Sequence, residues 1–256
     1  VIQYCDEVKA DGFDLVDDFS DLFGMNAAGT DAKMRNTKES ILEAQFTSGA
    51  GNWCTWMFGR DLVNWNNNFT WAKWVTPSRD LISAFKQEGD EVRFKESIVY
   101  YDCNWSNYYP SDNYPFMYKC RSANSSIIKY RYADVLLLKA EALIMQDTPD
   151  LEGAADIIDE VRDRAKLGAL PTSVRSNKNV LLNALLKERR LELAFEGQRW
   201  FDLVRLDKVE EVMNAVYSKD SGRKAQIYTF DKNSYRLPIP QSVIDANDKI
   251  HQNPGY

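Results

Sequence analysis

The sequence of 256 residues has a single histidine and only four cysteines, two residue types that many catalytic and metal centres use. Its single histidine, His251, stands in a tail that contains Pro and Gly, so a Ser-His-Asp triad is not expected. Neither Asp112-Asn113 nor Asp245–Asp248 matches the helix–loop–helix calcium pattern, and both are interpreted as solvated turns. Phosphate-loop and dinucleotide fingerprints are also missing. The sequence therefore predicts no metal site and no cofactor.

Cysteine is scarce as well, and its spacing excludes a zinc ribbon. The four cysteines are Cys5, Cys54, Cys103 and Cys120. None forms a CxxC pair, so no zinc site is expected. Four cysteines allow three pairings if all are bridged. Cys103 and Cys120 flank an aromatic stretch, and the sequence leaves open whether they bridge it or remain buried free thiols.

Long hydrophobic runs and excess positive charge are also absent. No window of about 18 apolar residues occurs, so no membrane-spanning helix is predicted. The net charge is −6 and the sequence pI is near 5.0, which argues against a nucleic-acid partner, because a phosphate backbone attracts clustered positive charge. With 44% hydrophobic and 12% aromatic residues, the chain has the composition of a globular protein.

Helical spacing of apolar residues dominates the chain, so the predicted fold class is mainly α. Helices are expected at Val1–Ala10, Asp17–Phe23, Pro77–Glu88, Tyr130–Gln146, Leu151–Ala165, Asn179–Leu206 and Val209–Ser218. Extended segments are expected at Glu39–Phe46, Val92–Tyr101 and Tyr235–Pro240, and irregular chain at Thr47–Trp74 and Cys103–Ser126. Alanines in the pair of helices at 130–165 allow the close helix approach of tetratricopeptide-like repeats.

The segment Leu186–Leu206, LKERRLELAFEGQRWFDLVRL, concentrates charge and aromatics in one helical pattern. Its carboxylates, Glu188, Glu192, Glu196 and Asp202, suggest the acid pair of a glycosidase at first sight. Arginines stand among them at positions 189, 190, 199 and 205, however, and such neighbours lower a carboxylate pKa, which is the wrong direction for a general acid. We therefore predict a partly buried structural ion network here, with no catalytic residue.

This segment also carries a family resemblance. ERRLELAFEGQRWFDLVRL resembles the C-terminal signature helix of SusD/RagB proteins, which are surface lipoproteins that capture nutrients. Three more segments agree in the expected order: YRYADVLLLKAEAL at Tyr130–Leu143, AADIIDEVRDRAKL at Ala154–Leu167, and the closing YRLPIPQSVIDANDKIHQNPGY at Tyr235–Tyr256. The resemblance implies a tetratricopeptide-like α/α superhelix with long irregular loop insertions and a few short strands.

The resemblance further implies how the chain is organised and what it does. Residues 1–256 would be the C-terminal part of one SusD-like domain, divided into the end of upstream helical repeats (1–24), a ligand-binding insertion (39–126) and the signature region (127–256). The implied function is non-catalytic capture of an oligosaccharide. The implied partner is a SusC-like TonB-dependent transporter of the outer membrane. Attachment to the membrane is expected only through a lipid anchor in an N-terminal part that precedes this chain.

The candidate binding residues come from two loops rich in Trp, Tyr and Asn. Five of the seven tryptophans fall within Trp53–Trp74, interleaved with Asn and Arg. Aromatic rings offer flat faces to the C–H groups of sugars, and amides and guanidinium groups bind the hydroxyl rim. The predicted glycan-binding residues are Trp53, Trp56, Arg60, Trp65, Asn66 and Asn67 from the first loop, and Trp105, Tyr108 and Tyr109 from the second. The competing interpretation is that these rings only pack the loops against the helices, as is expected for Trp71 and Trp74.

Other functions remain open on sequence alone. Aromatic loops also suit peptide capture, as in the RagB branch of the family. A helical-repeat scaffold that uses these loops only for a protein interface is a second alternative, and a hydrolase is a distant third.

Overall fold

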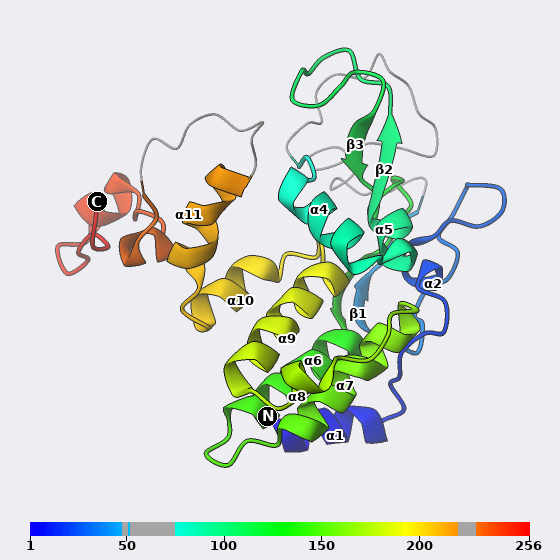
Figure 1. The fold of residues 1–256 in the computed structure, drawn as a ribbon. Coiled ribbons are helices and arrows are strands. Elements are labelled where there is room, and N and C mark those ends of the chain that lie inside the picture. Colours follow the sequence, from blue (N-terminus) through cyan, green and yellow to red (C-terminus); the bar gives the residue numbers. More distant parts are fainter. Residues whose placement is uncertain (48–50, 52–74, 220–228) are drawn as a thin grey trace. The chain divides into compact units, whose positions relative to one another are not determined.

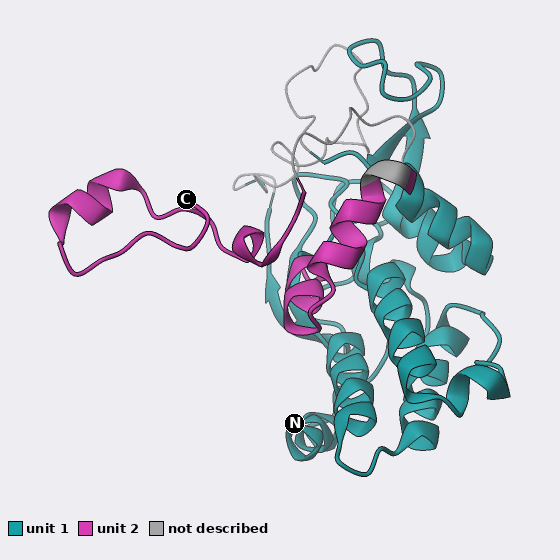
Figure 2. Cartoon of the chain, turned by 60° about the vertical axis from the view of Figure 1, so that its left-hand side comes forward, with its two compact units in different colours: residues 1–197 teal, residues 198–256 magenta. Residues whose placement is uncertain are grey.

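The computed structural model describes residues 1–47, 51, 75–219 and 229–256 (Figure 1). Two compact units make up the chain, Val1–Gly197 and Gln198–Tyr256, which Figure 2 shows in separate colours. The predicted residues Trp53, Trp56, Arg60, Trp65, Asn66 and Asn67 lie outside the described residues, as do Trp71 and Trp74.

A hairpin of two helices forms the core of the first unit. Helix α6 (Tyr132–Met145) packs on α7 (Leu151–Arg164), and both contact α9 (Lys178–Glu192), while α1 (Ile2–Ala10) also packs on α6. The alanines that the sequence placed at the helix crossings are fully or almost fully buried: Ala133, Ala140, Ala154 and Ala165. Asp150 caps α7 by accepting a hydrogen bond from the backbone N–H of Gly153. The predicted helical hairpin is thus confirmed.

A two-stranded antiparallel ribbon lies beside this hairpin. Strand β1 (Ser40–Ala44) pairs with β4 (Ile127–Arg131), and Ala44 stands opposite Ile127 in the register. The short helix α2 (Ser20–Phe23) packs with β4 through a small cluster that includes Phe19, Phe23 and Ile128. β1 confirms the predicted extended segment, whereas the start of the Tyr130–Gln146 helix was predicted two residues too early, because β4 ends at Arg131.

Helix α4 (Arg79–Glu88) confirms the helix predicted at Pro77–Glu88 but begins two residues later, with Ser78 accepting a hydrogen bond from the N–H of Leu81. The extended segment predicted at Val92–Tyr101 is wrong over its first half, because α5 spans Glu91–Ser97 and only Ile98–Tyr101 form a strand, β2. The carboxylate of Asp90 accepts from the N–H of Arg93 and starts this helix. The buried guanidinium of Arg93 then donates to Glu188 and Glu192 of α9, which favours the helix over the predicted extended chain.

Strand β3 (Tyr114–Met117) pairs antiparallel with β2, in a segment that was predicted to be irregular throughout. The segment Tyr114–Met117 has only four residues, includes Pro115, and shows no alternation of apolar and polar side chains. The sequence alone therefore does not indicate a strand there. Cys103, just after β2, is a buried free thiol, so the bridge to Cys120 that the sequence left open is not formed. The two faces of this hairpin differ, since Ile98 joins the core with α4 and α9, while Tyr114 and Phe116 join an aromatic cluster.

The predicted helix Asn179–Leu206 is wrong in its middle. α9 ends at Glu192 and α10 spans Arg199–Arg205, with turns between them. Phe195 and Gly197 take the left-handed backbone conformation there, with φ of +66° and +84°. Glycine readily ends a helix in this way, so Gly197 was the local sign of the break, but its effect was outweighed by the strong helical periodicity on both sides.

The second unit contains α10, α11 (Val209–Lys219), the single-turn 3-10 helix η1 (Lys232–Tyr235) and α12 (Gln241–Ala246). α11 confirms the predicted helix at Val209–Ser218. Tyr235, the first residue of the predicted extended segment Tyr235–Pro240, belongs to η1, and extended backbone begins at Arg236. In the first unit, a four-residue helix, α8 (Thr172–Arg175), lies in the connection between α7 and α9. Within the described part of the chain, no helix combines the length and the apolar character needed to cross a membrane.

Candidate functional site

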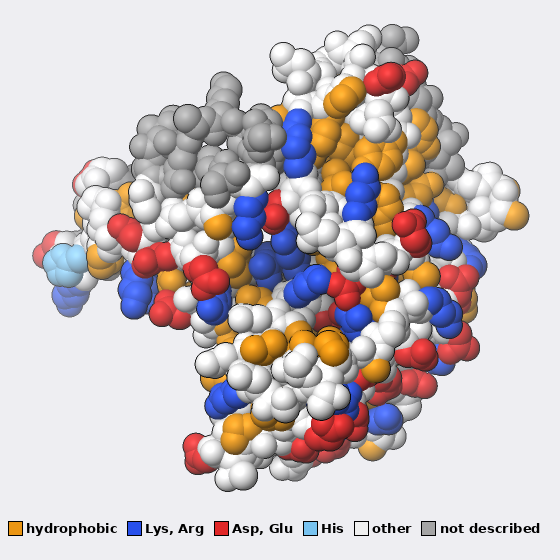
Figure 3. All heavy atoms as spheres, in the orientation of Figure 1, with side chains coloured by type: hydrophobic (Ala, Val, Ile, Leu, Met, Phe, Trp, Pro, Cys, Tyr) orange, Lys and Arg blue, Asp and Glu red, His pale blue; other side chains and the backbone are white. Residues whose placement is uncertain are grey.

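The second predicted loop, between β2 and β3, brings its aromatic residues together. Trp105, Tyr108 and Tyr109 are all half-buried and pack with the hairpin residues Tyr114 and Phe116. Ring centroids lie 6.0 Å apart for Trp105 and Phe116, 5.6 Å apart for Tyr109 and Tyr114, and 5.0 Å apart for Tyr108 and Tyr109. Apolar side chains gather over this hairpin in Figure 3. The three predicted residues therefore form one aromatic cluster.

Part of this cluster already has a structural role. The Arg79 guanidinium carbon lies 4.3 Å from the ring centroid of Tyr108 and 4.2 Å from that of Tyr109. The hydroxyl of Tyr109 donates to the carbonyl of Pro77 over 2.7 Å, which ties the loop to the start of α4. The side chains of Tyr108 and Tyr109 are thus already engaged in holding the loop against the start of α4. Trp105 is the better candidate for a ligand contact.

A hollow of about 440 Å³ adjoins the aromatic cluster, with which it shares Tyr101 and Tyr118. We call it the Tyr–Arg hollow. Its lining residues are Ser20, Gly24, Met25, Lys33, Glu96, Tyr101, Tyr118 and Arg121. The size is within the range of small-ligand sites, which is about 300–1,000 Å³. Sequence reasoning missed it, because these residues come from α2, the following loop, α5, the end of β2 and the segment after β3.

Arg121 organises the floor of the Tyr–Arg hollow. Its guanidinium carbon lies 3.6 Å from the ring centroid of Tyr118, and its Nε donates to the carbonyl of Tyr118 over 2.9 Å. Its Nη2 donates to the carboxylate of Glu96 over 2.7 Å. Both charged side chains are buried, so the ring and the two polar groups are held in fixed positions.

Lys33 brings a second cation to the rim of the hollow, and it is also paired. Its Nζ lies 2.7 Å from Oδ1 of Asp21 and 3.2 Å from Oδ2 of Asp18. The hydrogen bond that Lys33 donates to Asp21 is the main reason why the pKa of Lys33 is raised. Each cation of the hollow therefore faces a carboxylate, which leaves little uncompensated positive charge.

The ion network predicted for Leu186–Leu206 is present. Asp202 pairs with Arg205 inside the segment over 2.7 Å, whereas the partners of Glu192 come from outside it. Glu192 is fully buried and pairs with Arg93 over 2.9 Å, with Arg131 over 2.5 Å and with Arg164. All three arginines come from other elements, whereas Arg189 of the same helix pairs with Asp134 of α6. Burial opposes ionisation of Glu192, yet the three arginines hold its pKa well below the usual range.

The acidic groups on either side of Glu192 behave differently from each other. Glu196 accepts from Lys119 over 2.6 Å and from Arg131 over 2.7 Å, and these cations outweigh burial, so that its pKa is lowered. Burial raises the pKa of Glu188 despite its pairing with Arg93, which corrects the expectation of a lowered value. Glu188 does not line any of the three cavities found among the described residues. The network therefore ties α9 to β4 and α5, as a scaffold does.

No group of three or more His, Cys, Asp or Glu side chains among the described residues is placed to hold a metal ion. The Tyr–Arg hollow offers aromatic faces, hydroxyl groups, and fixed hydrogen-bond donors and acceptors.

Comparisons with known proteins agree with this architecture. The model of the SusD family matches residues 117–256, more than half of the chain. The SusD-like protein P38 of Formosa agariphila is 43% identical over 99 residues, which cover 36% of this chain and 19% of that protein.

Two solved structures are similar over nearly the whole chain. Surface glycan-binding protein A from Bacteroides thetaiotaomicron, in complex with laminarihexaose, has a TM-score of 0.74 at 19% identity, and the similarity covers 98% of this chain and 58% of that one. A laminarin-binding SusD-like protein has a TM-score of 0.64 at 25% identity, over 96% of this chain and 54% of that one. The chain thus spans little more than half the length of these structures, and their helical fold is shared.

Proposed function

Because the chain belongs to the SusD family, we propose that it binds a glycan without catalysing a reaction and takes part in delivering it to a TonB-dependent transporter. The observation that carries the proposal is the Tyr–Arg hollow, in which Tyr101 and Tyr118 lie beside the fixed pair of Arg121 and Glu96. A similar fold is solved with laminarihexaose bound, and another belongs to a protein described as laminarin-binding. Delivery to a transporter rests on family membership alone.

The hollow offers both kinds of contact that a sugar needs. The rings of Tyr101 and Tyr118 present flat apolar surface to sugar C–H groups. The carboxylate of Glu96 and the hydroxyl of Ser20 supply acceptors for sugar hydroxyls. A ring that covers roughly 100 Å² of apolar surface contributes about 2.5 kcal/mol before the costs of association. One or two such rings therefore suit affinities from about μM to mM, at which a captured ligand is also released.

The charges around the hollow favour a neutral glycan. Arg121 faces Glu96, and Lys33 faces Asp18 and Asp21. An anionic sugar would meet three carboxylates and only two cations, both already paired. Removing water from its acidic groups would cost free energy, and new ion pairs would offset little of that cost.

We propose that the wider binding surface includes both predicted loops. Trp105, with Tyr108 and Tyr109 behind it, would extend the hollow along the aromatic cluster. The residues proposed from the first loop are Trp53, Trp56, Arg60, Trp65, Asn66 and Asn67. In this proposal residues 39–126 form the ligand-binding insertion, 1–24 continue a helical repeat, and 127–256 form the signature region. An outer-membrane location through a lipid anchor belongs to the same proposal.

Calorimetric titration with laminarihexaose tests the function and the site together. We expect Tyr118→Ala and Trp105→Ala each to weaken binding about tenfold, because each removes one ring from the surface. The matched control is Tyr4→Ala on α1, a tyrosine that is 72% exposed and lines none of the three cavities.

The outcomes separate the alternatives. Binding that survives Tyr118→Ala and Trp105→Ala but is lost when Trp53, Trp56 and Trp65 become Ala would move the site to the first loop. A chain that ignores a glycan panel but binds peptides would be a RagB-like peptide receptor. A chain that binds neither, and pulls down a protein through its aromatic loops, would be an interaction scaffold. Glycan turnover by the purified chain would make it an enzyme.

A further inference from the structure

A second cavity, also of about 440 Å³, lies across the segment 117–121 from the Tyr–Arg hollow. Tyr118 and Arg121 line the hollow, whereas Met117, Lys119 and Cys120 line the second cavity, which we call the Lys129 cavity. The chain leaves strand β3 at Met117 and turns at Lys119 and Cys120, so that this one short segment contributes to the walls of both cavities. The lining residues of the Lys129 cavity are Phe23, Val75, Met117, Lys119, Cys120, Ser126, Ile127, Ile128, Lys129, Phe195, Glu196 and Gly197.

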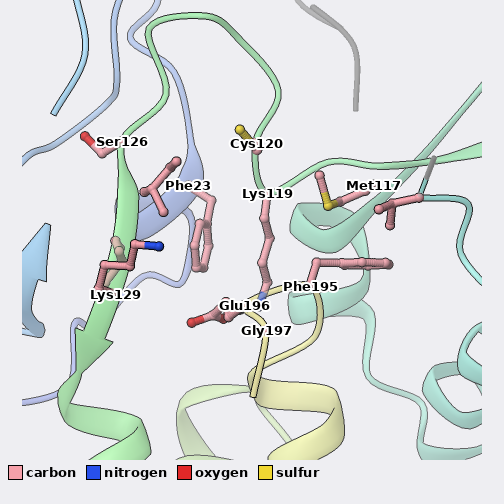
Figure 4. Close-up of a pocket in the computed structure, with 12 residues that line it drawn as sticks. Phe23, Met117, Lys119, Cys120, Ser126, Lys129, Phe195, Glu196 and Gly197 are labelled. Atoms are coloured by element: carbon pink, nitrogen blue, oxygen red, sulfur yellow. Dashed lines mark hydrogen bonds and ion pairs between the residues drawn. The ribbon is translucent and has the colours of Figure 1, made fainter. Parts of the chain in front are cut away.

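The walls of this cavity are mainly apolar and include two aromatic rings. Figure 4 shows Phe23 on one side and Phe195 on the other. Phe195 lines the cavity from the break between α9 and α10, where its backbone is left-handed, with φ of +66°. A bulky side chain seldom adopts this conformation, and such strained positions are enriched at ligand sites. A continuous helix, as predicted from sequence, would not have this turn at Phe195.

The floor of the cavity is a closed ion pair. Lys119 donates to the carboxylate of Glu196 over 2.6 Å and to the carbonyl of Glu192 over 2.8 Å, and its ammonium lies 4.7 Å from the ring centroid of Phe23. Glu196 also accepts two hydrogen bonds from Arg131. These groups satisfy one another, so the floor attracts neither an anion nor a cation strongly.

The rim carries a cation without a counter-charge. Lys129 is exposed on β4, and Figure 4 shows its amino group turned toward the cavity. Within the described ranges, no carboxylate lies within ion-pair distance of its Nζ. With Lys119 neutralised by Glu196, Lys129 carries the one positive charge without an ion-pair partner among the described residues that line the cavity.

We propose that the Lys129 cavity binds an aryl acid, that is, a flat apolar ring system with one carboxylate or sulfonate group. The rings would lie against Phe23 and Phe195, and the anionic group would meet the ammonium of Lys129. This site is separate from the Tyr–Arg hollow, and it does not require that the protein bind glycans.

Two dyes with the same ring system test the proposal directly. 8-Anilinonaphthalene-1-sulfonate is anionic, and N-phenyl-1-naphthylamine is its neutral counterpart. We expect both to bind the folded full chain at one site with increased fluorescence, the anionic dye about threefold to tenfold more tightly, as one exposed ion pair permits. The anionic dye should also raise the melting temperature, because it binds the folded state.

Variants locate the site. Lys129→Met should remove the preference for the anionic dye and leave the affinity for the neutral dye unchanged. Ile127→Trp, which fills the cavity from β4, should weaken both dyes at least tenfold; far-UV circular dichroism shows whether it folds. Lys86→Met on α4, another exposed lysine, is the matched control and should change neither affinity.

Several results would overturn the proposal. These are the absence of saturable binding of either dye to the folded chain, an anionic preference that survives Lys129→Met, and a folded Ile127→Trp variant that binds both dyes as before. A melting temperature lowered by the dye would mean that it binds unfolded chain, which would overturn the proposal too. None of these results bears on binding of laminarihexaose at the hollow, so the two proposals fail separately.

Discussion

Lys119 Nζ lies 2.6 Å from Oε1 of Glu196, although the two residues are 77 positions apart in the chain. Both side chains are buried, at 4% and 9% exposure, beneath the Lys129 cavity. This contact joins the segment after β3 to the break between α9 and α10. It belongs to an ion network that continues through Arg131 to Glu192.

Removing the centre of this network should destabilise the fold strongly. Glu192→Gln leaves Arg93, Arg131 and Arg164 without their shared carboxylate in a buried place. We expect the free energy of unfolding to fall by about 3–5 kcal/mol, measured by urea denaturation. Glu152→Gln, which removes an ion pair from a side chain that is 72% exposed, should cost less than about 1 kcal/mol. Equal losses for the two variants would contradict a buried network.

Lys119 should make stability depend on pH above neutrality. Burial lowers the pKa of Lys119 to about 8 from the ordinary 10.5, against the attraction of Glu196. Between these two values the unfolded chain binds a proton that the folded chain has released, so the free energy of unfolding rises with pH. At about 1.4 kcal/mol for each unit of pKa, the gain across the interval is about 3 kcal/mol.

The measurement compares wild type with Lys119→Met by urea denaturation at pH 7 and pH 10. The stability of wild type relative to the variant should increase at the higher pH. Lys86→Met, at an exposed lysine, should show no such change relative to wild type. If the difference in free energy of unfolding between wild type and Lys119→Met stays constant or shrinks as the pH rises, burial does not lower the pKa of Lys119.

Two glycines offer a matched test of backbone strain. Gly89 ends α4 with φ of +70°, and a Cβ added there would meet nothing within 4 Å. Gly89→Ala should therefore lower the free energy of unfolding by about 1 kcal/mol, because alanine disfavours a positive φ and no steric clash contributes. Gly168 has equally open surroundings but an ordinary φ, so Gly168→Ala should be neutral or up to about 1 kcal/mol stabilising. Thermal unfolding of both variants checks the contrast. Similar effects at the two sites would indicate that α4 can end without a left-handed residue.

The pairing of charges around the Tyr–Arg hollow predicts its ligand preference. Laminarihexaose, which is neutral, should bind more tightly than an oligogalacturonate of the same length. Glu96→Gln removes the partner of Arg121, so it should raise the affinity for the anionic sugar about threefold to tenfold relative to the neutral one, as measured by calorimetry. Asp207→Asn, at an acidic residue of the second unit that does not line the hollow, is the control. An unchanged ratio in Glu96→Gln would show that Arg121 does not face the ligand.

Local patterns were sufficient for much of the helical architecture. The apolar periodicity of Tyr130–Gln146 and Leu151–Ala165 predicted α6 and α7 to within two residues at each end. Such features depend on neighbours within one or two turns, which the sequence displays directly. Trp105, Tyr108 and Tyr109 were proposed as binding residues from composition alone, and the structure brings their rings into one aromatic cluster.

The errors share one physical cause. α5 was predicted as extended chain, and α9 and α10 as one helix, because the decisive contacts are with distant residues. Arg93 binds Glu188 and Glu192, 95 and 99 positions further along the chain, and no local pattern shows that pairing. In the short β2–β3 hairpin, β2 lay within a predicted extended segment, but β3 was predicted as irregular chain. The reason is the same, because a four-residue strand is hard to recognise without the strand that it pairs with.

The sequence by itself determined the family, the helical hairpin and the presence of a charged signature segment, because periodicity, capping and motif order are local properties. Only the tertiary structure decided which charges pair, where the signature segment breaks, and that the two sides of the segment 117–121 form walls of two different cavities. Ion pairing and cavity shape depend on residues brought together from separate elements. Their positions follow from the packing of the whole unit, and spacing along the chain does not encode them.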